Sequence, residues 1–223
     1  TDSIFFGAVI SVVGYLIGIF LRKKISVLNP LLVSIIFVIA VIKIFHIDYE
    51  TYNSGAKYIS YLLTPATVCL AIPLYRQISV LKEHAKEVFI GILAGVLASM
   101  GSILLMSYLF GLTHEQYVTL LPKSITTAIG MGVSEELGGI QTITVAVIII
   151  TGVLGNIIAE AVLKIFRIKE PVAKGLAIGT ASHAIGTTKA LEIGEIEGAM
   201  SSLSVAVAGL MTVISASIFA NMM

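Results

Sequence analysis

The sequence predicts an all-α polytopic membrane protein with about seven spanning helices, one segment that dips into the bilayer and returns, and helices broken near the midplane. Of its 223 residues, 57% are hydrophobic and only 12% are charged, and the mean hydropathy is +1.01. Soluble domains carry about 25% charged residues, so this chain has too few polar side chains to coat a water-exposed globule. With a net charge of +1, the chain lacks the excess of basic residues with which proteins bind nucleic acid.

Four hydrophobic stretches make up the first half of the chain. Residues 4–21 meet the requirement of about 20 apolar residues for a crossing helix. Three basic residues follow them at once, which indicates a first membrane helix rather than a cleaved targeting peptide. The other stretches are a short helix opened by Pro30 at 30–45, a span interrupted by prolines at 59–75, and a long helix at 88–110.

The second half contains three spans and one segment of a different kind. Residues 117–139 are apolar enough to enter a bilayer, but Pro122 and four glycines after it make one plain helix unfavourable. The three spans are expected at 141–166, 172–191 and 199–223. Because only short loops join these elements, we expect a single transmembrane domain over residues 1–223.

Loop charges predict how the chain is oriented. Basic residues concentrate in loops 22–29, 76–87 and 164–174, which the positive-inside rule places in the cytoplasm. The N-terminus and the acidic loop 192–197 are then expected outside. Only if residues 117–139 dip in and return on the same side do all three basic loops share one face.

Two pairs of similar segments predict an inverted-topology internal repeat, with halves of approximately 1–111 and 112–223. Val41–Ile47 and Val162–Ile168 share a Lys-Ile-Phe core at the ends of two predicted helices. Ala94–Leu97 and Ala208–Met211 match in the same order later in each half. The predicted loop orientations make the two Lys-Ile-Phe helices run in opposite directions.

Three segments at membrane depth are predicted to be irregular, at residues 64–73, 122–132 and 179–189. Irregular backbone survives in hydrocarbon only where it is buried or lines a wet cavity, and broken helices in transporters aim their N-termini at anionic ligands. An alternative is that these are proline kinks with hydroxyls bonded to the turn above. The substrate-binding candidates without charge are Thr64, Pro65, Thr67, Ser124, Thr126, Thr127, Ser182 and Thr187.

Ionisable side chains inside the predicted spans add further candidates. A charge at the bilayer centre costs about 2.5–3.5 kcal/mol on insertion scales, so each one suggests a function. Lys123 would neutralise a carboxylate, whereas His183 would bond it or carry a proton. Glu160 is a second proton-coupling candidate, or a structural partner of a cation. Snorkelling of Lys123 and Lys189 to the interface, and a neutral His183 bonded to a neighbouring helix, are the alternatives.

Catalysis and metal binding have no support in the sequence. Ser182 and His183 are adjacent, so on a helix they point about 100° apart and do not form a nucleophile–base pair. The chain has no metal-binding or phosphate-binding motif, and its single Cys69 lies in an apolar run. We therefore expect no enzyme activity, no metal and no cofactor.

Three runs resemble the LrgB/CidB family of bacterial membrane proteins, and the resemblance covers essentially the whole chain. These runs are Leu63–Gln77, Leu121–Thr127 and Gly175–Thr187. The family's pattern falls on the substrate-binding candidates named above, together with Pro73 and Pro122. Ala128 and Gly130 stand where some members have Pro and Ala, which leaves the shape of the dipping segment open.

The resemblance implies two competing functions. Relatives in bacteria and in the plant plastid envelope transport small carboxylates, so the first is a secondary transporter of monocarboxylates such as pyruvate, lactate, glycolate or glycerate. The second is a holin- or antiholin-like oligomeric protein that modulates murein hydrolase export and cell lysis beside a small partner of the LrgA/CidA type. The matched polar breaks favour the transporter. A dimer in the bacterial plasma membrane is expected in either case.

Overall fold

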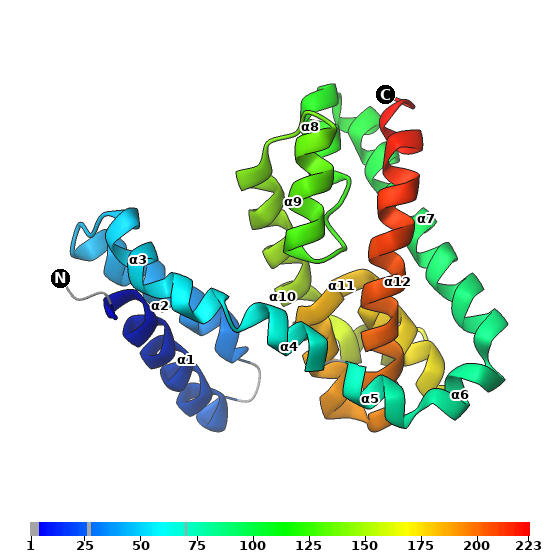
Figure 1. The fold of residues 1–223 in the computed structure, drawn as a ribbon, viewed down its shortest axis with the longest axis horizontal. Coiled ribbons are helices and arrows are strands. Elements are labelled where there is room, and N and C mark those ends of the chain that lie inside the picture. The colour runs from blue at the N-terminus through cyan, green and yellow to red at the C-terminus, as the bar shows by residue number, and fades with distance from the viewer. Residues whose placement is uncertain (1–4, 26–27, 70) are drawn as a thin grey trace. The chain divides into compact units, whose positions relative to one another are not determined.

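The structure, a computed structural model, describes residues 5–25, 28–69 and 71–223, without the side chains of Leu63, Thr64, Thr67 and Leu74. Every regular element in these residues is a helix (Figure 1). The chain forms two compact units, Thr1–Cys69 and Leu70–Met223. The single domain with halves 1–111 and 112–223 stays a prediction.

In its described residues the first unit has four helices, α1 (Phe6–Lys24), α2 (Pro30–Ile44), α3 (Tyr49–Ser60) and α4 (Leu63–Cys69). Helix α2 starts at Pro30 because the Asn29 side chain accepts hydrogen bonds from the two backbone N–H groups that follow the proline. Helix α1 packs closely on α2, since a Cβ added at Gly18 would contact the backbone of Pro30. Ser11 and Tyr52 join α1 to α3 through a 2.8 Å hydrogen bond between their hydroxyls.

Eight helices form the second unit: α5 (Ala71–Arg76), α6 (Ile78–Glu83), α7 (Ala85–Phe110), α8 (His114–Leu120), α9 (Thr127–Glu136), α10 (Gln141–Ile165), α11 (Pro171–Ile193) and α12 (Glu195–Ala220). Across the described residues, α1, α7, α10 and α12 are long and apolar enough to cross a membrane, and α2 is a shorter apolar helix. No more than 39% of any of these four spans is buried. Their exposed apolar faces fit a lipid environment, whereas the count of about seven spans stays a prediction.

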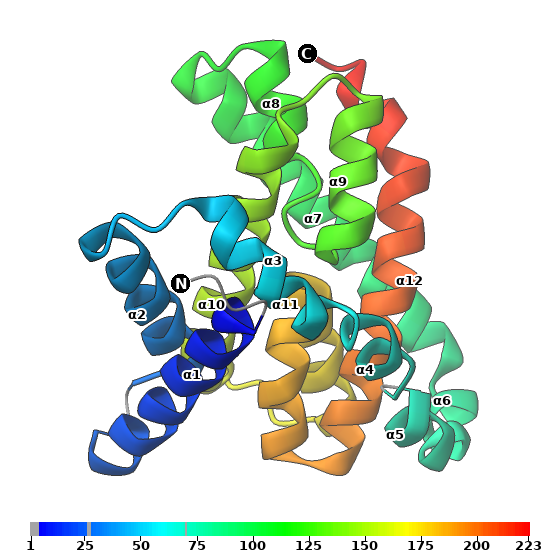
Figure 2. The same ribbon diagram turned by 60° about the vertical axis from the view of Figure 1, so that its left-hand side comes forward.

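Helices α8 and α9 form a hairpin, called the upper hairpin here. The Tyr117 hydroxyl of α8 donates to the carbonyl of Phe219 at the end of α12. The turn between α8 and α9 lies beside the middle of α7, where Ser124 bonds to Ser99. The chain then returns, because the backbone N–H of Ile140 donates to the Thr119 hydroxyl of α8. The segment therefore enters the unit from one end and leaves at the same end (Figure 2), and a dip of residues 117–139 into the bilayer stays a prediction.

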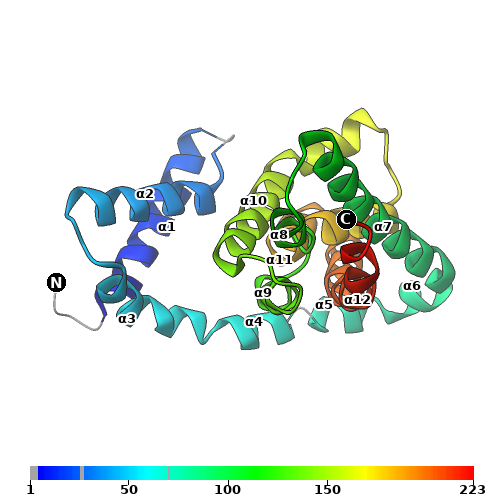
Figure 3. The same ribbon diagram turned by 90° about the horizontal axis from the view of Figure 1, so that it is seen from above.

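Helix α11 also folds back on itself, and the two halves on either side of His183 are called the lower hairpin here. His183 has φ 43° and ψ −143°, which breaks the helix. Ile178 and Ala190 pack into one apolar cluster with Leu163 of α10, although an unbroken helix would hold them about 18 Å apart. The side views place this hairpin below the upper one (Figures 1 and 2), and the two partly overlap from above (Figure 3).

This second fold-back corrects two predictions. Glu197 at the start of α12 pairs with Lys174 at the start of α11 at 3.4 Å, so the acidic loop 192–197 does not lie opposite the basic loop 164–174. Helices α7 and α12 consequently run in the same direction, and the Tyr108 hydroxyl near the end of α7 donates to the Met222 carbonyl just beyond α12. The predicted inverted relation is wrong for this pair, because the chain turns back at His183 instead of crossing.

The two Lys-Ile-Phe segments nevertheless end their helices in the same way. His46 and Arg167 follow the phenylalanines and both adopt positive φ, 50° and 55°. The N–H of Ile47 donates to the Ile42 carbonyl at 3.0 Å, and the N–H of Ile168 donates to the carbonyl of Leu163 at 2.9 Å. Each is the six-to-one bond of a Schellman cap with a non-glycine residue in the left-handed position. The local match supports a relation between these segments, and an inverted repeat of whole halves does not follow from it.

Thiol labelling tests the fold-back at His183. In a Cys69→Ser background, Lys82→Cys, Lys169→Cys and Glu195→Cys should all react with a membrane-impermeant maleimide from one face, because both ends of the lower hairpin lie together. Glu115→Cys should react from the other face, and the sequence predicts the same for Lys57→Cys. Labelling of the Glu195 variant from the face opposite to the Lys169 variant would show that α11 crosses the membrane.

Candidate functional site

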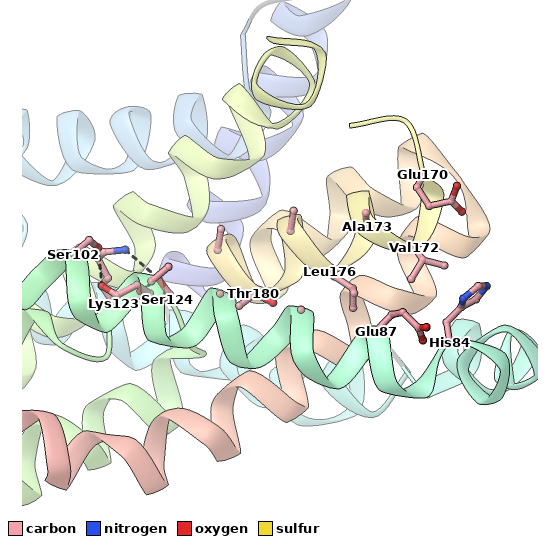
Figure 4. A pocket seen from close by; sticks show the side chains of 16 residues that line it. His84, Glu87, Ser102, Lys123, Ser124, Glu170, Val172, Ala173, Leu176 and Thr180 are labelled. Atoms are coloured by element: carbon pink, nitrogen blue, oxygen red, sulfur yellow. Dashed lines mark hydrogen bonds between the residues drawn. The ribbon is translucent and has the colours of Figure 1, made fainter. Parts of the chain in front are cut away.

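A cavity of about 710 Å³ lies in the second unit between α7 and the first half of α11 (Figure 4). Small side chains make room for it, because residues four apart on a helix share one face. Ala173, Ala177 and Ala181 form such a row on α11, opposite Gly91 and Gly95 of α7. The cavity's two ends differ in charge: His84, Glu87 and Glu170 surround one end, and Ser99, Ser102, Lys123 and Ser124 the other.

Lys123 lies at the tip of the upper hairpin because Pro122 ends α8. Proline disfavours helical conformation in the residue before it, and α8 stops at Leu120. The Lys123 ammonium donates to the Ser124 hydroxyl at 3.0 Å, and that hydroxyl lies 2.9 Å from the hydroxyl of Ser99 on α7. Within the part of the chain that the structure describes, no carboxylate pairs with Lys123. A half-buried cation with only hydroxyl partners is therefore available to an anion in the cavity.

The cavity ends at Lys123. Beyond it, the upper hairpin presents Tyr117, Val118 and Leu121, which are at most 1% exposed and belong to the main apolar core. The opposite end is near loops 76–87 and 164–174, since His84 and Glu170 line the cavity there. The predicted common end for these two basic loops agrees with this arrangement.

Thr180 carries the one buried hydroxyl along the cavity wall that has no hydrogen-bond partner in the described residues. Its methyl group faces Gly95, where an added Cβ would approach it to 2.6 Å. An unsatisfied buried hydroxyl costs about 1–3 kcal/mol. The contact between α7 and α11 therefore contains an unsatisfied hydroxyl at the depth of the tip of the upper hairpin.

His183 does not line the cavity. Its ring nitrogen Nε2 donates to the Ile148 carbonyl of α10 at 3.1 Å, and the side chain is 3% exposed. Gly152 leaves room for the imidazole, since an added Cβ would lie 2.7 Å from it. Ser182 packs against Gly155 in the same way, and Thr187 bonds to the His183 carbonyl and to Ser201. These three candidates hold the tip of the lower hairpin.

Variants of His183 separate this positioning role from proton transfer. His183→Ala should lose the bond to Ile148 and leave a void, lowering the free energy of unfolding by about 2–3 kcal/mol. His183→Asn should retain most of the stability and the uptake, because Asn tolerates positive φ and its amide can donate. Thermal unfolding in detergent and proteoliposome uptake measure the two effects. A His183→Asn variant with wild-type stability and no uptake would contradict the positioning role.

The other predicted residues lie apart from the cavity wall. Thr126 and Thr127 begin α9, next to the hairpin tip, and do not line the cavity. Pro65 lies on α4 in the first unit, and the side chains of Thr64 and Thr67 on the same helix are outside the described residues. Glu160 pairs with Lys189 and lines a separate space of about 430 Å³ between α10 and α11.

Sequence reasoning did not select Ser99 and Ser102 as site residues. Gly91, Gly95, Ser99 and Ser102 follow at spacings of four, four and three, which puts them on one face of α7. That small and polar row on one face of α7 is the signal in the sequence that points to them. No group of three or more His, Cys, Asp or Glu side chains within residues 5–25, 28–69 and 71–223 is placed to hold a metal ion.

Comparison with known proteins decides the family. Residues 11–222 match the LrgB-like family. The chain belongs to it. The antiholin-like protein LrgB of Bacillus mycoides strain KBAB4 is 38% identical over 217 residues, which are 96% of this chain and 94% of that protein. Proteins of the same name from Bacillus cereus strain B4264 and Bacillus anthracis strain CDC 684 match over the same shares with the same identity.

Membership of the LrgB-like family confirms the resemblance given by the three sequence runs. Together with the four long apolar helices, it makes this chain a multi-pass membrane protein. No solved structure gives a significant match. The function of the cavity therefore has to be argued from its own side chains.

Proposed function

We propose that this LrgB-family protein is a secondary transporter of small monocarboxylates, of the pyruvate, lactate, glycolate or glycerate class. The observation that carries the proposal is the cavity that ends on Lys123, a cation with no carboxylate partner among the described residues. A carboxylate there would exchange water for the ammonium and the hydroxyls of Ser99 and Ser124. Hydrogen bonds to a charged partner contribute about 1.5–3 kcal/mol each.

The end of the cavity at the upper hairpin favours a carrier over a pore. The cavity extends from His84, Glu87 and Glu170 to Lys123, and fully buried residues of the upper hairpin lie beyond Lys123. A carrier alternates access to a site near the midplane, which broken helices typically form. We infer that the two hairpins are dips into the bilayer from opposite faces, and that the basic loops 76–87 and 164–174 are cytoplasmic.

The second candidate is an antiholin-like oligomer that modulates murein hydrolase export and lysis. The names of the Bacillus relatives favour it directly, and more strongly than they favour transport. A small membrane partner of the LrgA/CidA type and a dimer belong to this proposal. Helix association through small residues is its physical basis. On α7, however, Gly91 and Gly95 already face α11, and only Gly101 faces open space.

Uptake into proteoliposomes separates the two candidates. A carrier should take up radiolabelled lactate with saturation, and unlabelled pyruvate or glycolate should compete. A pore should leak lactate and an unrelated neutral solute of similar size, such as glycerol, without saturation. Reconstitution with and without a small LrgA/CidA-type protein tests whether the partner is needed. Leakage of both solutes in proportion to concentration would reject the carrier.

A further inference from the structure

The cavity is much larger than the acids proposed above. The inference drawn from this difference in size rests on the proposed function. Pyruvate has six non-hydrogen atoms, and even at the roughly 30 Å³ that a water molecule occupies in the liquid they fill at most about 180 Å³. The cavity holds about 710 Å³. A two- or three-carbon acid bound at Lys123 would leave most of this space unfilled.

The unfilled part of the cavity has an apolar wall. Between Lys123 and the end lined by Glu87 and Glu170, the lining residues are Gly91, Gly95, Ala98, Ala173, Leu176 and Ala177. These residues contribute no polar side-chain atom, and the Thr180 hydroxyl farther in is buried away from the cavity. Water beside such a wall lacks good partners, so replacing it with methylene groups is favourable.

The length of this apolar stretch limits the ligand. Ser99 beside Lys123 and Gly91 near Glu87 are eight residues apart on α7, about 12 Å along a helix. With C–C bonds of about 1.5 Å, an extended chain advances about 1.3 Å per methylene and needs about nine methylenes to span it. Past Gly91, the carboxylates of Glu87 and Glu170 make this end of the cavity unfavourable for both an apolar tail and a second carboxylate.

We propose that this cavity binds monocarboxylates with an unbranched apolar tail of about four to eight carbons, with the carboxylate on Lys123 and the tail along the alanine row of α11. Dicarboxylates of the same length are excluded. Each buried methylene contributes about 0.8 kcal/mol, which corresponds to an increase in affinity of up to about four-fold per carbon.

Competition binding to the full chain in nanodiscs tests this proposal, with radiolabelled butyrate as the probe. Acetate, butyrate, hexanoate, octanoate and dodecanoate should displace it with rising potency up to octanoate, at least tenfold between acetate and hexanoate, and then level off. Hexanedioate should be at least tenfold weaker than hexanoate. Ala177→Asn should remove the advantage of hexanoate over acetate, whereas Ala161→Asn, on an exposed position of α10 outside the cavity wall, should leave that advantage unchanged.

The outcomes distinguish this proposal from the transport proposal. If displacement depends on Lys123 but not on chain length, the tail does not contact the wall and the further inference is overturned, while carboxylate binding stands. If no acid displaces butyrate in a Lys123-dependent way, the proposed function itself fails. If potency keeps rising to dodecanoate and is unaffected by Lys123→Met, the cavity is a groove for lipid chains and the inference is equally overturned.

Discussion

Lys123→Met should reduce saturable lactate uptake by at least about 30-fold. Methionine keeps an unbranched apolar stem of similar length, and it removes the one positive charge that the described residues place at the inner end of the cavity wall. A charged hydrogen bond contributes about 1.5–3 kcal/mol, and roughly 2 kcal/mol corresponds to a factor of about 30. The measurement is the initial rate of uptake into proteoliposomes across a range of lactate concentrations.

Two matched variants make this result specific. Lys123→Arg keeps the charge and should retain part of the uptake, although a planar guanidinium cannot reproduce the bond to Ser124. Lys86→Met removes an exposed charge at the start of α7, outside the cavity wall, and should transport like the wild type. Equal uptake by Lys123→Met and Lys86→Met would mean that Lys123 snorkels and binds nothing, and the site assignment would be lost.

Hydropathy and proline placement anticipated much of the helical layout. The predicted spans 88–110 and 141–166 correspond closely to α7 and α10, and predicted residues 30–45 correspond to α2. For residues 117–139, the glycines and Pro122 predict a weakened helix and loop charge predicts a return to the same face, and this dip into the membrane stays a prediction. Helix-breaking residues act locally, and loop charge is a sum over nearby residues. Both can therefore be evaluated from the sequence without knowing which helices are in contact.

The fold-back of α11 was not anticipated, because residues 172–191 have the length and apolar character of a crossing helix. Its cause is a set of tertiary contacts. The ring of His183 bonds to the Ile148 carbonyl, and Gly152 and Gly155 leave room for the tip of the lower hairpin. A positive φ at a histidine leaves no pattern in the sequence. The charged residues at both ends of the segment, Lys174 and Glu192, fitted a crossing helix as well as a hairpin.

The predicted site residues also differ in whether a local signal or a tertiary contact fixes their position. Lys123 and Ser124 reached the cavity because a proline break fixes their place locally, and their charge and polarity mark them. Ser182, His183 and Thr187 were chosen for the same polarity, but they satisfy backbone and side-chain partners inside the lower hairpin. Polarity at membrane depth therefore identifies buried networks and ligand sites alike, and only the contacts distinguish them.

Gly179→Ala should lower the stability of the protein markedly, whereas Gly101→Ala should raise it slightly. Both glycines are helical, but a Cβ at Gly179 would lie within 2.8 Å of the Ser201 Cα atom, whereas a Cβ at Gly101 would meet nothing within 4 Å. The clash is with backbone of α12, which cannot rotate aside, so α11 must move. Overpacking costs about 1–3 kcal/mol, and Ala in place of an unhindered helical Gly gains up to about 1 kcal/mol.

Thermal unfolding of the two variants in detergent measures this difference, and uptake shows its functional consequence. Helices α11 and α12 form the most extensive helix contact of the second unit, and the first half of α11 is one wall of the cavity. Moving that wall by a fraction of an ångström should weaken carboxylate binding together with stability. Unfolding temperatures for Gly179→Ala and Gly101→Ala that agree within error would mean that α11 does not pack against α12 in this way, and the alanine row could not then face Gly91 and Gly95.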